Sequence, residues 1–207
     1  MLRMLIADDH AIVRRGLRDI LLEQFPSAEI TEVSDTAALF AKIIKEEWDI
    51  VITDLSMPGR SSLDAMPEIK QHAPRLPVLI LSIYPEDQYA VRVLKAGASG
   101  YLNKDMAPDE LINAVHCVLG GRKYITPSVA ERLVDLPALE KPLHEYLSNR
   151  EFEALKLIAA GKSITEIGET FHLSITTIST YRARILRKLQ VKTNAELIQY
   201  AIHHRLI

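Results

Sequence analysis

Short apolar runs alternate with amphipathic stretches through the first 104 residues. The runs have the length of strands and lie at residues 3–7, 29–33, 49–53, 77–82 and 100–103. Between them apolar residues recur at helical spacing. Two such stripes are Val13, Leu17, Ile20 and Leu21, and Ala37, Phe40, Ile43 and Ile44. The runs Ile50-Val51-Ile52 and Val78-Leu79-Ile80-Leu81 are apolar on both faces, which is typical of buried parallel strands. Five such βα units predict an α/β fold with an open, doubly wound parallel sheet.

Residues 148–207 have helical spacing throughout and several signals for helix starts. Capping boxes are expected at Ser148–Glu151, Ser163–Glu166 and Thr193–Glu196, and Ser174 is expected to cap a further helix. These signals predict a small all-α domain of four helices with short joints. Two of the helices, about 164–172 and 175–189, are separated only by the turn around Leu173. That arrangement is typical of a helix-turn-helix.

The segment between these regions contains Pro127, Pro137 and Pro142. Thr126-Pro127 favours a short helix, and residues 135–146 are interpreted as connecting chain. We therefore expect one domain at 3–121, a linker at 122–145 and a second domain at 146–207. Whether the linker also sets the docking of the domains is left open by the sequence.

Composition and charge add a contrast between the two halves. The chain has 207 residues, 48% of them hydrophobic and 25% charged, with a net charge of −2. Residues 1–125 hold 14 basic and 18 acidic side chains, whereas residues 148–207 hold 9 and 5. This contrast favours domains with different partners. A single cysteine, Cys117, and the early acids Asp8 and Asp9 favour a cytoplasmic protein with no membrane partner.

Polar residues follow the apolar runs of the first half. Asp8-Asp9 follow the first run, Asp54 the third, Ser82 ends the fourth and Lys104 follows the fifth. Ligand sites of open α/β sheets lie at the carboxyl ends of the strands, so these side chains are expected to converge. Clustered carboxylates repel one another unless a cation joins them, and Mg²⁺ prefers such oxygen ligands. The set predicts a Mg²⁺-dependent phosphoryl site. Singly, each residue has a simpler interpretation, such as a helix cap at Asp8 or a turn at Asp54 before Met57-Pro58-Gly59.

From residue 3 to about 120 the chain resembles the receiver domains of response regulators, which have a flavodoxin-like (βα)5 fold. The matching stretches are Leu5-Ile6-Ala7-Asp8-Asp9-His10, Ile52-Thr53-Asp54-Leu55-Ser56-Met57-Pro58-Gly59, Leu81-Ser82, and Lys95-Ala96-Gly97-Ala98-Ser99-Gly100-Tyr101-Leu102-Asn103-Lys104. The resemblance implies that Asp54 is phosphorylated by a histidine kinase. It also implies that Asp8, Asp9, Asp54 and the Ser56 backbone carbonyl hold Mg²⁺.

The same resemblance implies that Ser82 and Tyr101 form the switch pair and that Lys104 binds the phosphoryl group. Two positions depart from the common receiver pattern. Ile83 stands after the switch hydroxyl where small residues are frequent, and Asp105 stands after Lys104 where proline is frequent. Neither departure removes a catalytic group.

The second helix of the helix-turn-helix has a polar face suited to the DNA major groove. Its candidate DNA-binding residues are Thr176, Thr177, Ser179, Thr180, Tyr181, Arg182, Arg184, Arg187 and Lys188. An amphipathic surface helix is the alternative interpretation. Residues 146–207 also resemble LuxR-type domains, through Leu147-Ser148-Asn149-Arg150-Glu151, Glu166-Ile167-Gly168 and Ile185-Leu186-Arg187-Lys188-Leu189. Ser179 and Tyr181 depart from that family, which often has Lys and His at these positions.

Together the two resemblances identify the chain as similar to NarL/FixJ-type response regulators. They imply a transcription factor, not an enzyme, that binds promoter DNA at paired half-sites and forms a homodimer when phosphorylated. Two alternatives stay open. A constitutive DNA-binding regulator would have a receiver that does not switch. A hydrolase of the haloacid-dehalogenase type would need an acid two residues after Asp54, where this chain has Ser56.

Overall fold

The computed structural model describes residues 1–57, 61–105, 108–135 and 142–207. Pro58, Gly59, Ala107 and Pro137, which the sequence assigned to turns, a helix start and the linker, lie outside these ranges. The chain divides into two compact units, Met1–Asp135 and Leu136–Ile207. Among the described residues, no helix has both the length and the apolar character needed to cross a bilayer.

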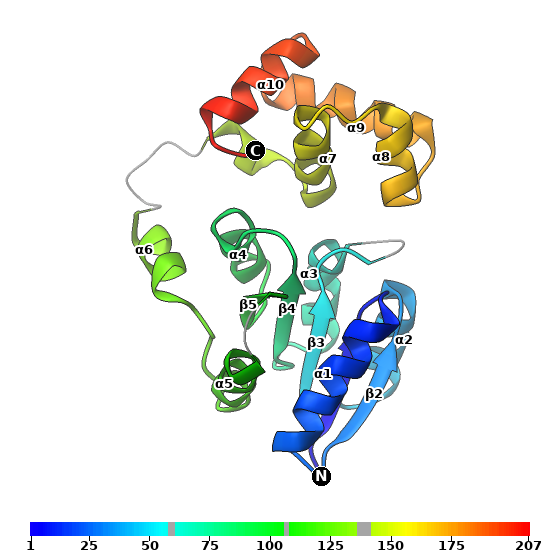
Figure 1. The fold of residues 1–207 in the computed structure, drawn as a ribbon, viewed down its shortest axis with the longest axis vertical. Coiled ribbons are helices and arrows are strands. Elements are labelled where there is room, and N and C mark those ends of the chain that lie inside the picture. Colours follow the sequence, from blue (N-terminus) through cyan, green and yellow to red (C-terminus); the bar gives the residue numbers. More distant parts are fainter. Residues whose placement is uncertain (58–60, 106–107, 136–141) are drawn as a thin grey trace. The chain divides into compact units, whose positions relative to one another are not determined.

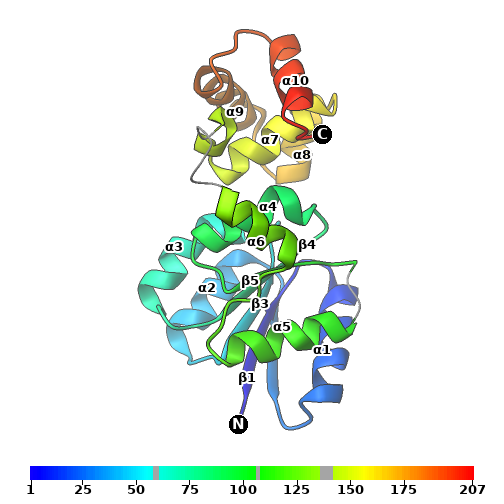
Figure 2. The same ribbon diagram turned by 90° about the vertical axis from the view of Figure 1, so that its left-hand side faces the viewer.

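The first unit is built on a parallel sheet of five strands in the order β2-β1-β3-β4-β5 (Figure 1). The strands are β1 (Arg3–Ala7), β2 (Glu29–Val33), β3 (Ile50–Asp54), β4 (Val78–Ser82) and β5 (Gly100–Asn103). The helices that connect them are α1 (Ala11–Gln24), α2 (Thr36–Lys45), α3 (Ser62–His72) and α4 (Glu86–Lys95), and α5 (Pro108–Leu119) follows β5. Helices α1 and α5 cover one face of the sheet and α2, α3 and α4 the other (Figures 1 and 2). The predicted flavodoxin-like fold is confirmed.

Burial on both faces explains why the central strands read as continuous apolar runs. Every residue of β3 and β4 is buried, whereas the edge strand β2 has none in that class. One core lies between the sheet and helices α1 and α5. Its main members are Met4, Ile6, Leu17, Leu21, Ile50, Ile52, Leu79, Leu81, Leu102, Leu111, Ala114, Val115 and Val118.

The predicted stripe of α2 is wrong at both ends, because Ala37 and Ile44 are exposed. Leu39 and Ile43 are buried, but Ile44 is 52% exposed. Consecutive residues of a helix point about 100° apart, so a helix that buries Ile43 turns Ile44 toward its edge. A periodic pattern with an apolar residue at both positions cannot decide between them.

The Thr126-Pro127 signal correctly predicted a short helix, α6 (Pro127–Asp135), within the stretch expected to be linker. This helix lies in the first unit and packs on α4 (Figure 2). The second unit opens with the 3₁₀ turn η1 (Leu143–Tyr146), within the stretch expected to be connecting chain. Four helices follow as predicted: α7 (Asn149–Ala159), α8 (Ile164–Phe171), α9 (Ile175–Lys188) and α10 (Asn194–His203).

The predicted capping signals hold at three of the four helices. Ser148 and Ser163 form complete capping boxes with Glu151 and Glu166, and Ser174 caps α9 by accepting from the N–H of Thr177. The box predicted at Thr193 is wrong in one half. Thr193 accepts from the N–H of Glu196, but the Glu196 carboxylate accepts from the N–H of Lys192 instead of closing the box. The carboxylate therefore fixes the residue before the cap.

Candidate functional site

The strand order places two acidic positions at the centre of the sheet. Helical connections run in opposite directions from β1 and β3, which are neighbours, so their carboxyl ends flank the crevice where α/β sheets bind ligands. Asp8 directly follows β1 and Asp54 is the last residue of β3. The structure thus brings together two acids that are 46 positions apart in the sequence.

Lys104 joins these two carboxylates. Its Nζ lies 2.6 Å from Oδ2 of Asp8 and 3.2 Å from Oδ2 of Asp54. Asp8 is fully buried and Asp54 is 6% exposed. Burial raises the pKa of Asp54 to about 6, although Lys104 and the backbone N–H of Ser56 oppose that rise and Asp8 adds to it. Burial by itself would lower the pKa of Lys104, but the bond to Asp8 and both negative charges raise it overall.

Asp9 and His10 extend the acidic cluster toward solvent. Nδ1 of His10 lies 2.8 Å from Oδ1 of Asp9 and 3.2 Å from Oδ1 of Asp8. Within the described parts of the chain, Asp8, Asp9 and His10 are the group whose ligand atoms lie close enough together to hold a metal, all within 4.8 Å. The oxygen-rich donor set suits a hard divalent cation such as Mg²⁺.

Arg14 fixes the loop that carries this cluster, and sequence reasoning missed it. Its Nη1 donates to the backbone carbonyl of Asp8 at 2.7 Å, while its Nε pairs with Glu32 at 3.4 Å. The signal was present, because a long cation in the first turns of a helix can reach back to the loop before it.

Ser82 and Tyr101 meet through the backbone of Tyr84. The Ser82 hydroxyl accepts from the N–H of Tyr84 at 3.1 Å, and the Tyr101 hydroxyl donates to the carbonyl of Tyr84 at 2.7 Å. Tyr101 is 2% exposed, and burial raises its pKa well above the usual value. Ile83, between these positions, is 68% exposed. The β4–α4 loop is therefore held from both switch positions.

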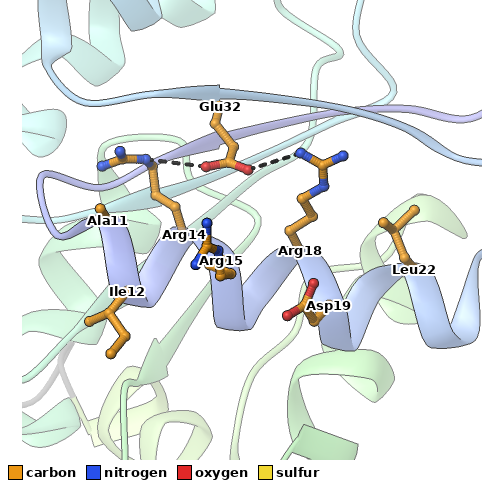
Figure 3. Close-up of a pocket in the computed structure, with 8 residues that line it drawn as sticks. All are labelled: Ala11, Ile12, Arg14, Arg15, Arg18, Asp19, Leu22 and Glu32. Carbon is orange, nitrogen blue, oxygen red and sulfur yellow. Dashed lines mark hydrogen bonds and ion pairs between the residues drawn. The ribbon is translucent and has the colours of Figure 1, made fainter.

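A separate surface pocket lies along α1 (Figure 3). Its lining includes Arg14 but none of the acidic cluster, Lys104, Ser82 or Tyr101. Arg14 and Arg18 both point to Glu32 of β2 across it. It is lined by Ala11, Ile12, Arg14, Arg15, Arg18, Asp19, Leu22 and Glu32. Its wall is thus the α1 helix that begins at the acidic loop.

In the second unit, α8 and α9 form a tight helix-turn-helix. His172 ends α8 in the left-handed conformation, with φ 54° and ψ 42°, and its N–H bonds back to α8. Gly168 permits the close return of the chain, because a Cβ there would lie 3.0 Å from the carbonyl of Leu173. Ile178 and Ile185 of α9 are buried, so the opposite face of that helix is turned to solvent.

The predicted DNA-binding residues of α9 fall into two groups. The side chains open to solvent are Thr176, Ser179, Thr180, Arg184 and Arg187, whereas Thr177, Tyr181, Arg182 and Lys188 are partly buried. Three of the latter have partners within the domain, and the hydroxyls of Thr177 and Ser174 lie 2.8 Å apart. Nε of Arg182 donates to Oδ1 of Asn194 at 2.7 Å, and Nζ of Lys188 lies 2.6 Å from Oε2 of the buried Glu151. Sequence periodicity placed Lys188 on the polar face but could not show this ion pair.

Comparison with known protein families accounts for both units. Residues 4–116 match the response regulator receiver domain, and residues 145–201 match the bacterial regulatory proteins of the luxR family. This chain is a response regulator of the NarL/FixJ type.

Relatives of the regulator match it over its whole length. It is 35% identical to the oxygen regulatory protein NreC of Staphylococcus carnosus, an alignment that covers 100% of this chain and 99% of that protein. It is 32% identical to the response regulator UvrY of Escherichia coli, over 100% and 96% of the two chains. Among solved structures, it resembles RcsB of Salmonella enterica serovar Typhimurium bound to promoter rprA in the presence of the phosphomimetic BeF₃⁻. That likeness has a TM-score of 0.64, 32% identity, and coverage of 96% of this chain and 97% of RcsB.

Proposed function

We propose that Asp54 of this response regulator accepts a phosphoryl group from a histidine kinase, and that this modification controls promoter binding by α9. The observation that carries the proposal is the convergence of Asp8, Asp54 and Lys104, with Nζ of Lys104 within 3.2 Å of both carboxylates. A nucleophile, an acidic metal site and a cation for the transferred group are the parts that phosphoryl transfer requires.

Asp8, Asp9, Asp54 and the backbone carbonyl of Ser56 are the groups that would hold Mg²⁺. The donor set fits because two buried carboxylates, those of Asp8 and Asp54, share the single ammonium group of Lys104. Mg²⁺ bound there would neutralise negative charge on the phosphoryl oxygens.

The chain's own residues supply the rest of the reaction. A carboxylate oxygen of Asp54 attacks phosphorus and forms an O–P bond, while the P–N bond to the kinase histidine breaks and the imidazole keeps the electron pair. Lys104 exchanges part of its interaction with Asp54 for the phosphoryl oxygens. Ser82, a buried residue at the end of β4 beside β3, donates a hydrogen bond to the new phosphoryl group.

The DNA-binding role is assigned to the solvent-facing residues of α9. Thr176, Ser179 and Thr180 lie near its N-terminal end, where recognition helices reach base edges. Arg184 and Arg187 lie further along and contact phosphates. RcsB has been solved as two dimers bound to two parallel DNAs. For this regulator we propose a homodimer on two half-sites, acting in the cytoplasm.

Selection from a randomised duplex pool tests this function. The wild type, Asp54→Ala and the control Asp19→Ala, which removes an exposed acid of α1, are each incubated with and without Mg²⁺ and acetyl phosphate. Intact mass reports phosphorylation in the same samples. The wild type and Asp19→Ala should gain one phosphoryl group and bind DNA more tightly, whereas Asp54→Ala should do neither.

Two other results would replace the proposal. Sequence-specific binding that ignores phosphorylation would favour a constitutive DNA-binding regulator. Turnover of a generic phosphate monoester would favour the hydrolase alternative.

A further inference from the structure

The chain after α5 returns to the receiver sheet before it forms α6. The N–H of Tyr124 donates to the carbonyl of Ser99 at 2.8 Å, and Tyr124 pairs with Gly100 in a parallel bridge. Gly100 is what permits this approach, since a Cβ there would lie 2.8 Å from Cδ2 of Leu79 and 3.0 Å from Cβ of Tyr124. The start of the linker is therefore fixed beside β5, the strand that carries the switch residue Tyr101.

Tyr124 is also fixed through its side chain. Its hydroxyl donates to Oε1 of Glu110 on α5 at 3.1 Å. Burial and the nearby Glu110 raise the pKa of Tyr124 to about 12, so the hydroxyl keeps its proton as donor at physiological pH. These bonds position the next residues, from Thr126 onward, beside the N-terminal end of α4.

The carboxylate of Glu86 on α4 accepts hydrogen bonds from two of these residues. The Thr126 hydroxyl donates to Oε1 of Glu86 at 2.7 Å, and the Ser128 hydroxyl donates to Oε2 at 3.2 Å. Thr126 directly precedes α6, and its Oγ1 accepts from the N–H of Val129 at 3.5 Å, the bond of a helix cap. Glu86 is the first residue of α4. A single negative charge therefore lies at the N-termini of two helices, where helix dipoles favour it.

The same carboxylate is four residues from the switch hydroxyl. Ser82 and Tyr101 both bond to the backbone of Tyr84, and the Tyr84 ring stacks on that of Tyr89 at 4.9 Å. A displacement of Ser82 toward Asp54 is therefore expected to move the backbone of Tyr84 and, two residues later, Glu86. Packed structures respond to such small shifts by changing between discrete arrangements.

We propose that Glu86, Thr126 and Ser128 form a linker clasp, which anchors α6 to the receiver and is loosened when Asp54 is phosphorylated. The inference rests on the proposed function, because the phosphoryl group is its trigger. When Ser82 donates to the phosphoryl oxygen, its oxygen moves away from the Tyr84 N–H and the loop carries Glu86 away from the two hydroxyls. Helix α6 then loses its cap orientation and its charge-assisted bonds together.

Hydrogen exchange measured by mass spectrometry on the full chain tests the clasp. Peptides that cover 122–135 are compared in the wild type, Glu86→Gln, and the matched control Asp87→Asn, which neutralises the exposed neighbouring acid of the same helix turn. With Mg²⁺ and acetyl phosphate, wild-type α6 should exchange at least about tenfold faster, since bonds to charged groups are lost. Glu86→Gln should exchange faster before phosphorylation, whereas Asp87→Asn should match the wild type.

A second pair of variants separates the clasp from general destabilisation. Thr126→Ser keeps the hydroxyl and should behave as the wild type, while Thr126→Val should exchange as fast as Glu86→Gln. Peptides from β1 and β3 should be unchanged in all variants, because the core of the sheet does not depend on the clasp.

The outcomes distinguish the clasp from the proposed function. Phosphorylation seen by intact mass without faster exchange in α6 would overturn the clasp and leave the function standing. Equal exchange in Glu86→Gln and Asp87→Asn would also overturn it, whatever happens at Asp54. No phosphoryl group on the wild type under any donor would overturn both.

Discussion

Asp54 combines burial with negative charge, and this combination has a cost for folding. Its pKa of about 6 means that the folded protein holds the proton more tightly than the unfolded chain, whose carboxyl titrates near 3.8. The folded state is therefore penalised as pH rises through this window and is not penalised below it. The difference of about two pKa units corresponds to about 3 kcal/mol. The proposed phosphoacceptor is therefore kept ionised at the expense of stability.

The first prediction follows from that penalty. Asp54→Asn removes the buried charge but keeps the shape of the side chain, so without Mg²⁺ it should be about 2–3 kcal/mol more stable than the wild type at pH 7.5. The difference in the free energy of unfolding between the two proteins should decrease steadily toward pH 4.5, where the wild-type carboxyl is protonated. Urea unfolding of both proteins in EDTA measures it. A gap that does not change with pH would contradict the raised pKa.

At the scale of elements, two glycines with different surroundings test how closely the linker approaches the sheet. Gly100 of β5 faces Leu79 and Tyr124 at 2.8–3.0 Å from where a Cβ would stand, whereas Gly16, inside α1, has nothing within 4 Å. Gly100→Ala should lower the free energy of unfolding by about 1–3 kcal/mol through overpacking. Gly16→Ala should raise it by about 0.5–1 kcal/mol through helix propensity. Denaturant midpoints of the two variants should therefore move in opposite directions.

Helix α9 has both a cation that is paired within the domain and cations that are exposed to solvent. Lys188 pairs with Glu151, which is 3% exposed, and also donates to the carbonyl of Tyr146. The bond to Lys188 holds the pKa of Glu151 below its usual value, although burial acts in the opposite direction. Arg187, one residue earlier, is exposed.

These two neighbours should respond differently to removal. Lys188→Ala should cost about 2 kcal/mol of stability in the second unit, because it leaves a buried carboxylate unpaired. Arg187→Ala should leave stability nearly unchanged, weaken binding to all DNA sequences, and reduce the slope of log affinity against log salt by about 1. Thermal unfolding and salt titrations of DNA binding provide the measurements. An unchanged salt slope in Arg187→Ala would remove its assignment as a phosphate contact.

At the scale of the whole molecule, the two compact units divide the chemistry. The acidic cluster, the predicted switch residues and α6 lie in Met1–Asp135, and the helix-turn-helix lies in Leu136–Ile207. Each unit has its own buried apolar residues, so each is expected to unfold cooperatively.

Calorimetry should therefore show two transitions. Mg²⁺ at about 100 times its Kd should stabilise the first unit by about 2.7 kcal/mol and raise only its transition. Lys188→Ala should lower only the other transition. A single transition that both changes move together would show that the units unfold as one.

The sequence by itself determined the elements, the fold class and the residues of the acidic cluster. Apolar runs, capping residues and strand-end acids are local signals, and they placed Asp8, Asp54 and Lys104 correctly at one edge once the sheet was known to be parallel. Strand β3 lies one residue later than predicted, at Ile50–Asp54. Ile44 is exposed although the predicted stripe included it, because neighbouring apolar residues leave the buried face of a helix undecided.

Only the tertiary structure decided which side chains already have partners. Arg14 donates to the Asp8 carbonyl, and Lys188 pairs with Glu151. The Glu86 carboxylate accepts hydrogen bonds from Thr126 and Ser128. The contacts of Lys188 and Glu86 join positions 37 to 42 residues apart, and no periodicity reports the distance between such positions. Contacts of this kind depend on how elements pack together, so they appear only after the chain has folded.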